Sequence, residues 1–157
     1  MTRWQLLNLP VHLGERPEPW GTVAALWFVW EAACVDRLGV MSPWRRRWDV
    51  PFDPAIRIDW RGVWVPGPAW LRPATARGWR ARRRQDRQGW ALSEIGGHVL
   101  GRLKDVAFDP ATGSVSQWWL SRGRLADVLD GMVSVPASAV SEDGSGISWM
   151  STGDAVR

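Results

Sequence analysis

The stretch "GRLKDVAFDPATGSVSQWWLSRG", Gly101–Gly123, decides the fold because it contains two strands and the turn between them. "RLKDVAFD" has apolar residues at a strand-like spacing, and "SVSQWWLS" is rich in β-branched and aromatic residues. Between them, Asp109, Pro110 and Gly113 in "DPATG" favour a structural turn with Gly113 at a positive φ angle. The stretch therefore predicts a β-hairpin in which Asp109 hydrogen-bonds the turn backbone.

The residues after this hairpin predict further short strands. A longer connection has room for one helical turn at Leu125–Leu129, "MVSVPASAV" alternates and then turns at Pro136, and "ISWM" is a last short strand. Five or six short strands with closely spaced turn signals indicate an all-β unit, a small barrel or sandwich.

The N-terminal half repeats this pattern. Gly21 lies 80 residues before Gly101, and "VPF" at Val50–Phe52 resembles "VPA" at Val135–Ala137 after a five-residue length difference. The other matches are Phe28 with Phe108, Val35 with Val115, and Val23, Leu26 and Val40 with Leu103, Val106 and Leu120. Their order and spacing predict an internal duplication with a period of about 80–85 residues, longer than solenoid repeats use.

The C-terminal copy also resembles a known family. The pattern consists of Gly101, Leu103, Asp105, Val106, Phe108-Asp109, Thr112-Gly113, Val115, Ser121-Arg122-Gly123 and Val135-Pro136. It resembles the PRC-barrel domain, which is named for the reaction-centre H subunit of photosynthetic bacteria and also forms the C-terminal half of a ribosome maturation factor. The resemblance runs from about Ile95 to Met150 and, more weakly, from about Leu6 to Val65.

This resemblance implies an all-β fold of two small, strongly bent antiparallel PRC-like β-barrels in tandem. The first would be a degenerate unit at 1–66 and the second a clearer unit at 91–157, and a basic connector at 67–90 would join them. The two units could be separate, or they could pack into one body through their tryptophans. In the first copy, "FVWEAACV" replaces "FDPATGSV", and the longer stretch "VAALWFVWEAACVDRL", Val23–Leu38, by itself favours an amphipathic helix. We expect strands there, because the flanking matches fix the register, with a rebuilt turn.

Charge and tryptophan are unevenly distributed. The 157 residues include 14 Trp and no Tyr, and Lys104 stands beside 19 Arg, a bias that we attribute first to codon usage. The segment Pro66–Trp90 carries a charge of +6 and the rest of the chain −2. We expect its Arg80–Arg87 stretch to be exposed, either mobile or a short helix, with free arginine side chains.

Two basic stretches are the candidate contacts for a nucleic acid or another partner. Their residues are Trp44, Arg45, Arg46, Arg47 and Trp48 in the first, and Arg80, Arg82, Arg83, Arg84 and Arg87 in the second. Arginines can hold phosphates while tryptophan rings stack on bases. The alternative is that both stretches are solvated surface segments of an arginine-rich chain.

The sequence offers little enzymatic chemistry. We assign no catalytic residue, cofactor or metal site, and the PRC-barrel resemblance implies no shared catalytic residue. We therefore expect a non-enzymatic interaction module that binds a protein partner through a barrel edge or an aromatic patch, with homo-oligomers left open; the alternative is an RNA- or ribosome-associated protein. The single Cys34 excludes an intrachain disulfide, and without a signal peptide or membrane span we expect a cytoplasmic location.

Overall fold

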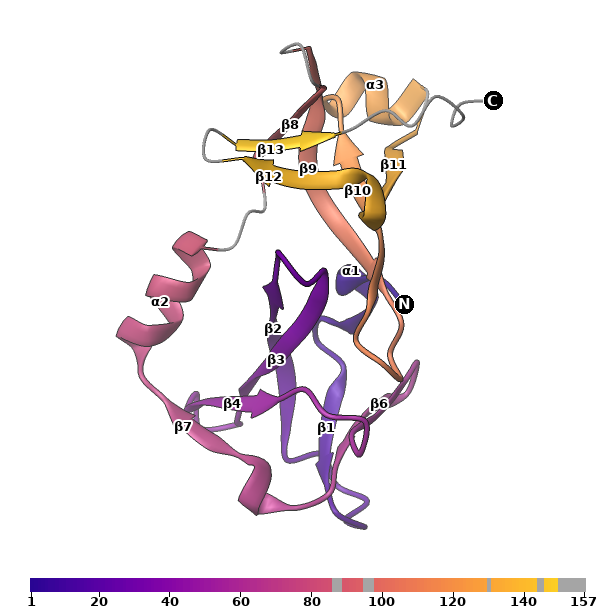
Figure 1. Cartoon of the computed structure of the whole chain (residues 1–157). Coiled ribbons are helices and arrows are strands. Elements are labelled where there is room, and N and C mark those ends of the chain that lie inside the picture. Colours follow the sequence, from indigo (N-terminus) through magenta and orange to yellow (C-terminus); the bar gives the residue numbers. More distant parts are fainter. Residues whose placement is uncertain (86–88, 95–97, 130, 144–145, 150–157) are drawn as a thin grey trace. The chain divides into compact units, whose positions relative to one another are not determined.

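The computed structural model describes residues 1–85, 89–94, 98–129, 131–143 and 146–149, which form two mostly β units (Figure 1). Unit 1 comprises Met1–Asp86 and Phe108–Ser114, and unit 2 comprises Arg87–Ala107 and Val115–Arg157. The division differs from the boundaries suggested by the sequence. Most of the expected connector belongs to unit 1, and so does the turn after residue 107.

Unit 1 is built on a seven-stranded sheet with the strand order β5-β6-β1-β2-β3-β4-β7. Its strands are β1 (Pro10–Leu13), β2 (Gly21–Val29), β3 (Cys34–Met41), β4 (Arg47–Pro51), β5 (Arg57–Asp59), β6 (Gly62–Val65) and β7 (Arg72–Ala74); its helices are α1 (Arg3–Leu6), the 3-10 turn η1 (Pro68–Trp70) and α2 (Ala76–Gln85). The pair β1–β6 is parallel, and the other neighbouring strands pair antiparallel.

Unit 2 is built on a six-stranded sheet with the strand order β11-β10-β9-β8-β13-β12. Its elements are β8 (Ala91–Glu94), β9 (Val99–Phe108), β10 (Val115–Ser121), α3 (Arg124–Leu129), β11 (Val133–Pro136), the 3-10 turn η2 (Ala137–Ala139), β12 (Val140–Asp143) and β13 (Gly146–Trp149). The expected hairpin is therefore β9–β10, and α3 occupies the expected helical turn.

The two sheets share one arrangement. The order β5-β6-β1-β2-β3-β4 in unit 1 corresponds strand by strand to β12-β13-β8-β9-β10-β11 in unit 2, and the parallel pair β1–β6 corresponds to the parallel pair β8–β13. The register also agrees, because Pro51 lies opposite Arg37 and Pro136 lies opposite Gln117. The repeat in the sequence predicted this agreement, because it pairs the two prolines at a spacing of 85 residues and their partners at a spacing of 80.

Two glycines hold equivalent places in this arrangement. A Cβ at Gly21 would lie 2.6 Å from the carbonyl oxygen of Met41, and one at Gly101 would lie 2.9 Å from that of Ser121. Neither space admits a side chain, because real Cβ atoms do not approach other heavy atoms so closely. The close approach of two strands therefore explains why glycine recurs at this spacing.

The cores of the two units use equivalent positions of the sheets. The buried pairs are Val11 and Leu92, Val23 and Leu103, Leu26 and Val106, Leu38 and Trp118, Val40 and Leu120, and Val50 and Val135. Trp118 thus serves the core of unit 2. Trp27 is buried in unit 1 against Trp79.

The stretch Val23–Leu38 of the first copy, which by itself favours a helix, forms strands, as the register of the repeat predicted. β2 and β3 cover most of it, and the turn between them is rebuilt, with the Ala33 N–H donating to the Trp30 carbonyl and Ala33 at a φ of +45°. The expectation of a mostly β structure is confirmed, because two antiparallel or mixed sheets dominate both units. Within the described residues these sheets are open and do not close into barrels. In the part of the chain that the structure covers, no helix has the length and apolar character to cross a membrane.

The turn "DPATG" has the predicted geometry. Gly113 has a φ of +75°, and its N–H donates to the Asp109 carbonyl. The Asp109 carboxylate accepts from the Ala111 N–H and from the Thr112 hydroxyl, and these two hydrogen bonds lower the pKa of Asp109. Within unit 1, the Gly113 carbonyl also accepts from the Val35 N–H, so the turn continues the hydrogen bonding of β3.

Gly113→Ala should lower the free energy of unfolding more than Gly131→Ala. Both glycines have nearly the same positive φ, +75° and +78°, which costs a side chain about 1 kcal/mol. At Gly113 the new Cβ would also lie 2.7 Å from the Phe52 ring, whereas a Cβ at Gly131 would meet no atom of the described residues within 4 Å beyond its chain neighbours. Urea unfolding should show roughly 1–2 kcal/mol of additional loss for Gly113→Ala. Equal losses would contradict the packing of this turn on Phe52.

Candidate nucleic-acid interface

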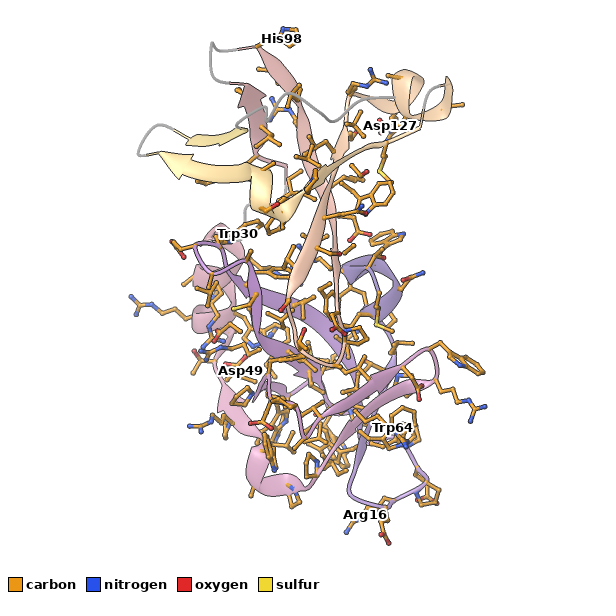
Figure 2. All side chains as sticks on the ribbon, turned by 45° about the vertical axis from the view of Figure 1, so that its right-hand side comes forward. Arg16, Trp30, Asp49, Trp64, His98 and Asp127 are labelled. Carbon is orange, nitrogen blue, oxygen red and sulfur yellow. The ribbon has the colours of Figure 1, made fainter. Side chains whose placement is uncertain are left out.

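A buried carboxylate connects the two basic stretches. Asp49 lies on β4, and only 4% of its surface is exposed. Its Oδ1 accepts a hydrogen bond from the Trp79 Nε1 at 3.1 Å, and its Oδ2 forms an ion pair with Arg82. Trp79 and Arg82 both lie on α2. Asp49, which is labelled in Figure 2, therefore holds the arginine-rich helix against β4, the strand that begins in the first basic stretch.

The Trp79 ring lies in a space that small residues leave open. A Cβ at Gly39 would lie 2.9 Å from the ring, and the methyl group of Ala25 borders the same space. Trp27 contacts the ring edge-on with a centroid distance of 6.1 Å, and the Arg47 guanidinium lies 5.8 Å from the ring centroid. Trp79 is 3% exposed, which makes it the buried anchor of α2.

Thr75 determines where α2 begins. Its hydroxyl accepts from the Gly78 N–H at 3.0 Å, and its carbonyl accepts from the Trp79 N–H at 3.0 Å, the bonding of a helix N-cap. The helix "ARGWRARRRQ" contains five arginines and no acidic residue. Arg77, Arg80 and Arg83 are exposed. The described side chains of α2 therefore combine a buried tryptophan and a paired arginine with arginines that face water.

The turn between β3 and β4 presents the first basic stretch. Buried Ser42 closes it, because its hydroxyl accepts from the Arg46 N–H while its carbonyl accepts from the Arg45 N–H. Arg45 has a φ of +59°, a conformation that costs a residue other than glycine about 1–2 kcal/mol. Trp44 is 76% exposed at the tip of this turn. A strained arginine thus lies beside an exposed tryptophan.

We refer to the exposed residues of these two elements as the arginine surface. Its members are Trp44, Arg45, Arg46, Arg77, Arg80 and Arg83. The elements that carry it are neighbours, because β4 pairs with β7, and α2 follows β7 and contacts β4 through Asp49. Unit 1 contains 14 of the 19 arginines against nine acidic residues, a net charge of +5, whereas unit 2 carries −1.

The predicted contact residues have different environments. Arg45, Arg46, Arg80 and Arg83 are exposed as expected, as is Trp44. Arg47 and Trp48 are half-buried, and the Trp48 ring contacts Trp20 edge-on at 5.5 Å. Arg84 lies in the last turn of α2 with its side chain outside the described part, and Arg87 lies outside the described residues altogether.

One expectation about the second stretch was wrong. Arg82 is not free, because it pairs with the buried Asp49, a residue that the sequence did not mark as a site residue. Trp79 was missed as well. The signal available for the helix was the N-cap Thr75 before an arginine-rich run, whereas no local pattern identifies Asp49 as its partner.

Comparison with known proteins does not place the chain in a family. No protein-family model matches it, and no curated protein is significantly similar to it. The described residues contain no group of three or more His, Cys, Asp or Glu side chains arranged to hold a metal ion. Only the geometry of the site itself therefore indicates a function.

Asp49→Ala should destabilise unit 1 by about 2–3 kcal/mol, less than the loss for a fully buried ion pair because the Arg82 side chain is 31% exposed. Asp49→Asn keeps an acceptor for the Trp79 indole and should lose less. The control is Asp53→Ala, which removes a hydrogen bond to the Ala55 N–H in an exposed turn. Urea unfolding measures all three variants. A loss no greater than that of the control would contradict the anchoring role of Asp49.

Arg45→Gly should stabilise unit 1 by roughly 0.5–1 kcal/mol, because relief of the positive φ exceeds the extra chain entropy of glycine. Arg46→Gly is the matched control. It removes the same charge from the same exposed turn at a residue whose φ is not positive, and it should destabilise by about 0.5–1 kcal/mol. Chemical unfolding of both variants tests this prediction, and changes of the same sign would refute it.

Proposed function

We propose that this protein is a non-enzymatic RNA-binding protein that holds single-stranded RNA on the arginine surface of unit 1. The observation that carries the proposal is the contact of Trp79 and Arg82 with Asp49, which brings both basic stretches onto neighbouring elements. Exposed arginines on these elements can neutralise successive phosphates, and Trp44 offers a ring on which a base can stack.

The charge distribution supports the same choice. Phosphate binding needs arginines that are not already neutralised by carboxylates. The pair with Asp49 uses Arg82 and leaves Arg80 and Arg83 exposed on the same helix. Binding of this kind is sequence-tolerant and strongly salt-dependent, because it releases counterions from the nucleic acid.

The sheet edges argue against a protein partner that adds a strand. The four strands that end the two sheet orders, β5, β7, β11 and β12, are only three or four residues long. Two of them contain a proline, Pro73 in β7 and Pro136 in β11, which lacks the N–H needed for pairing. Docking of a protein on these edges is therefore the second choice.

We also propose that the two units are copies of one PRC-like unit and that the first copy acquired the RNA-binding surface. Gly39 and Ala25, which leave room for Trp79, correspond at the 80-residue spacing to Trp119 and Asp105 in unit 2. Side chains as large as those of Trp119 and Asp105 would fill the space that Trp79 occupies in unit 1. A cytoplasmic location and a resemblance to ribosome maturation factor barrels, both of which we propose, would agree with an RNA ligand.

The test is fluorescence anisotropy of a labelled single-stranded 20-nucleotide oligouridine with the full chain. Replacement of Arg80 and Arg83 by Ser should weaken binding about tenfold at low salt and reduce the slope of log affinity against log salt by about 0.7 for each lost phosphate contact. The melting temperature should change little, because both side chains are exposed. The matched control replaces Arg61 and Arg124, two exposed arginines outside the arginine surface.

Arg45→Gly adds an independent test. It should weaken RNA binding while it stabilises the fold, so a general loss of structure cannot explain the weaker binding. Absence of RNA binding by the wild type at low salt would overturn the proposal. Equal weakening by the Arg61 and Arg124 control would show a nonspecific charge effect and would also overturn it.

A further inference from the structure

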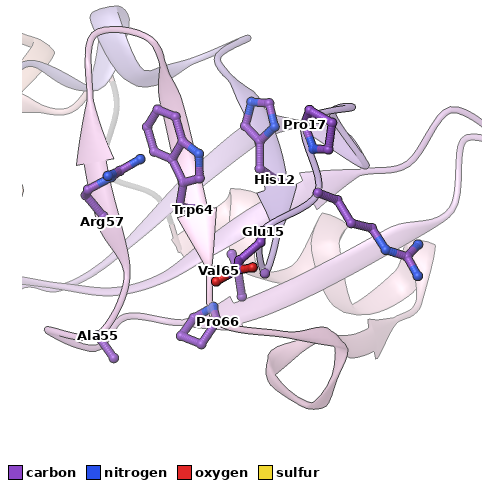
Figure 3. A pocket seen from close by; sticks show the side chains of 10 residues that line it. His12, Glu15, Pro17, Ala55, Arg57, Trp64, Val65 and Pro66 are labelled. Atoms are coloured by element: carbon purple, nitrogen blue, oxygen red, sulfur yellow. The ribbon is translucent and has the colours of Figure 1, made fainter.

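Unit 1 contains a second feature, an open pocket of about 670 Å³, between β1, β5, β6 and the loop after β1 (Figure 3). This volume lies in the range of small-molecule sites. The side chains that matter for the argument are His12, Glu15, Arg16, Pro17, Arg57 and Trp64. They combine two guanidinium groups, one carboxylate and a flat, partly apolar wall.

Three of these side chains form a ladder across neighbouring strands. Trp64 lies opposite His12 of β1 and opposite Arg57 of β5. The His12 and Trp64 rings are stacked with a centroid distance of 5.3 Å and an interplanar angle of 10°, and the Arg57 guanidinium lies 4.1 Å from the Trp64 ring centroid. The ladder fixes the Arg57 guanidinium and the imidazole at the wall of the pocket.

The fold itself does not require this ladder. In unit 2 the residues paired at the equivalent places of β8 and β13 are Ser93 and Ser148, so the same strand arrangement forms with two serines. The Nδ1 of His12 is buried and has no hydrogen-bond partner in the described structure. A buried polar atom without a partner costs stability, so a ligand that supplied the partner would be favoured.

The mixed charges restrict the ligand. Arg57, held over the Trp64 ring, suits a phosphate, since guanidinium groups bind phosphate oxygens with directed hydrogen bonds. A simple anion would gain nothing from Glu15, whereas a carboxylate is a suitable acceptor for ribose hydroxyl groups. The Trp64 ring is already covered by the His12 imidazole on one side and the Arg57 guanidinium on the other, so the apolar surface left for a flat ring is that of Pro17.

We infer that this pocket binds a nucleoside monophosphate group, with its phosphate on Arg57, its ribose hydroxyls on Glu15 and its base against Pro17. Two kinds of ligand carry this group, a free nucleotide and the 5′-phosphorylated end of an RNA strand. The second source rests on the proposed function, and the first does not.

The experiment uses the two histidines of the chain as reporters in proton NMR of the full protein. His12 lies in the pocket, and His98 is an exposed residue of unit 2 that serves as an internal control. AMP should shift the imidazole signals of His12 in a saturable manner and leave those of His98 in place. Adenosine and inorganic phosphate, each lacking part of the group, should bind at least about tenfold more weakly.

Matched variants test the contacts. Arg57→Gln should weaken AMP binding about tenfold, whereas Arg61→Gln should not change it. Arg61 also lies over a tryptophan ring, 4.7 Å from the centroid of Trp60, but does not line the pocket. Glu15→Gln should reduce the preference for AMP over its 2′-deoxy form.

The strand-end source is tested with decauridine that carries either a 5′-phosphate or a 5′-hydroxyl. A His12 shift with the phosphorylated strand but not with the other supports that source, and a shift with AMP alone supports the free nucleotide. No His12 shift with any ligand, equal shifts at both histidines, or equal weakening by Arg57→Gln and Arg61→Gln would overturn the inference. Failure of the arginine surface would appear instead as unchanged oligouridine affinity in the Arg80 and Arg83 variant.

Discussion

The arrangement of unit 1 around its arginine surface depends on one buried carboxylate. Asp49 accepts the indole N–H of Trp79 and pairs with Arg82, and it is itself almost fully buried. A carboxylate in that position is unfavourable unless hydrogen bonds and an opposite charge compensate it. Both come from α2, so the sheet and the helix satisfy one another, and the helix is held where its other arginines face water.

The second unit shows which features the fold requires and which are additions. Six strands of unit 1 and the six strands of unit 2 share one order and an equivalent parallel pair, and both units have a glycine where two strands approach closely. The two units differ at two places that carry the candidate binding residues of unit 1. One is Gly39, which leaves room for the Trp79 ring, and the other is the ladder of His12, Trp64 and Arg57. Residues that one copy has and the other lacks are not explained by the common framework, which favours a role in binding.

Local patterns in the sequence predicted local structure well. The positive φ of Gly113 follows from "DPATG", and the repeat spacing predicted the register of Pro51 and Pro136. The partner of Arg82 could not be predicted, because Asp49 lies 33 residues away in the sequence and only the completed sheet brings the two together. For the same reason His12 and Trp64, 52 residues apart, gave no sign of the pocket, since their contact depends on the parallel pairing of β1 and β6.

The arginine-rich helix illustrates how structure and binding are coupled. A ten-residue helix is marginal in water by itself, and like charges three or four residues apart, such as Arg80 and Arg83, oppose its formation. Burial of Trp79 and the pair between Arg82 and Asp49 offset this repulsion. A polyanion along the exposed arginines would reduce the same repulsion, so binding and helix stability should reinforce one another. The charge density that makes α2 costly to fold is thereby what makes it suitable for phosphates.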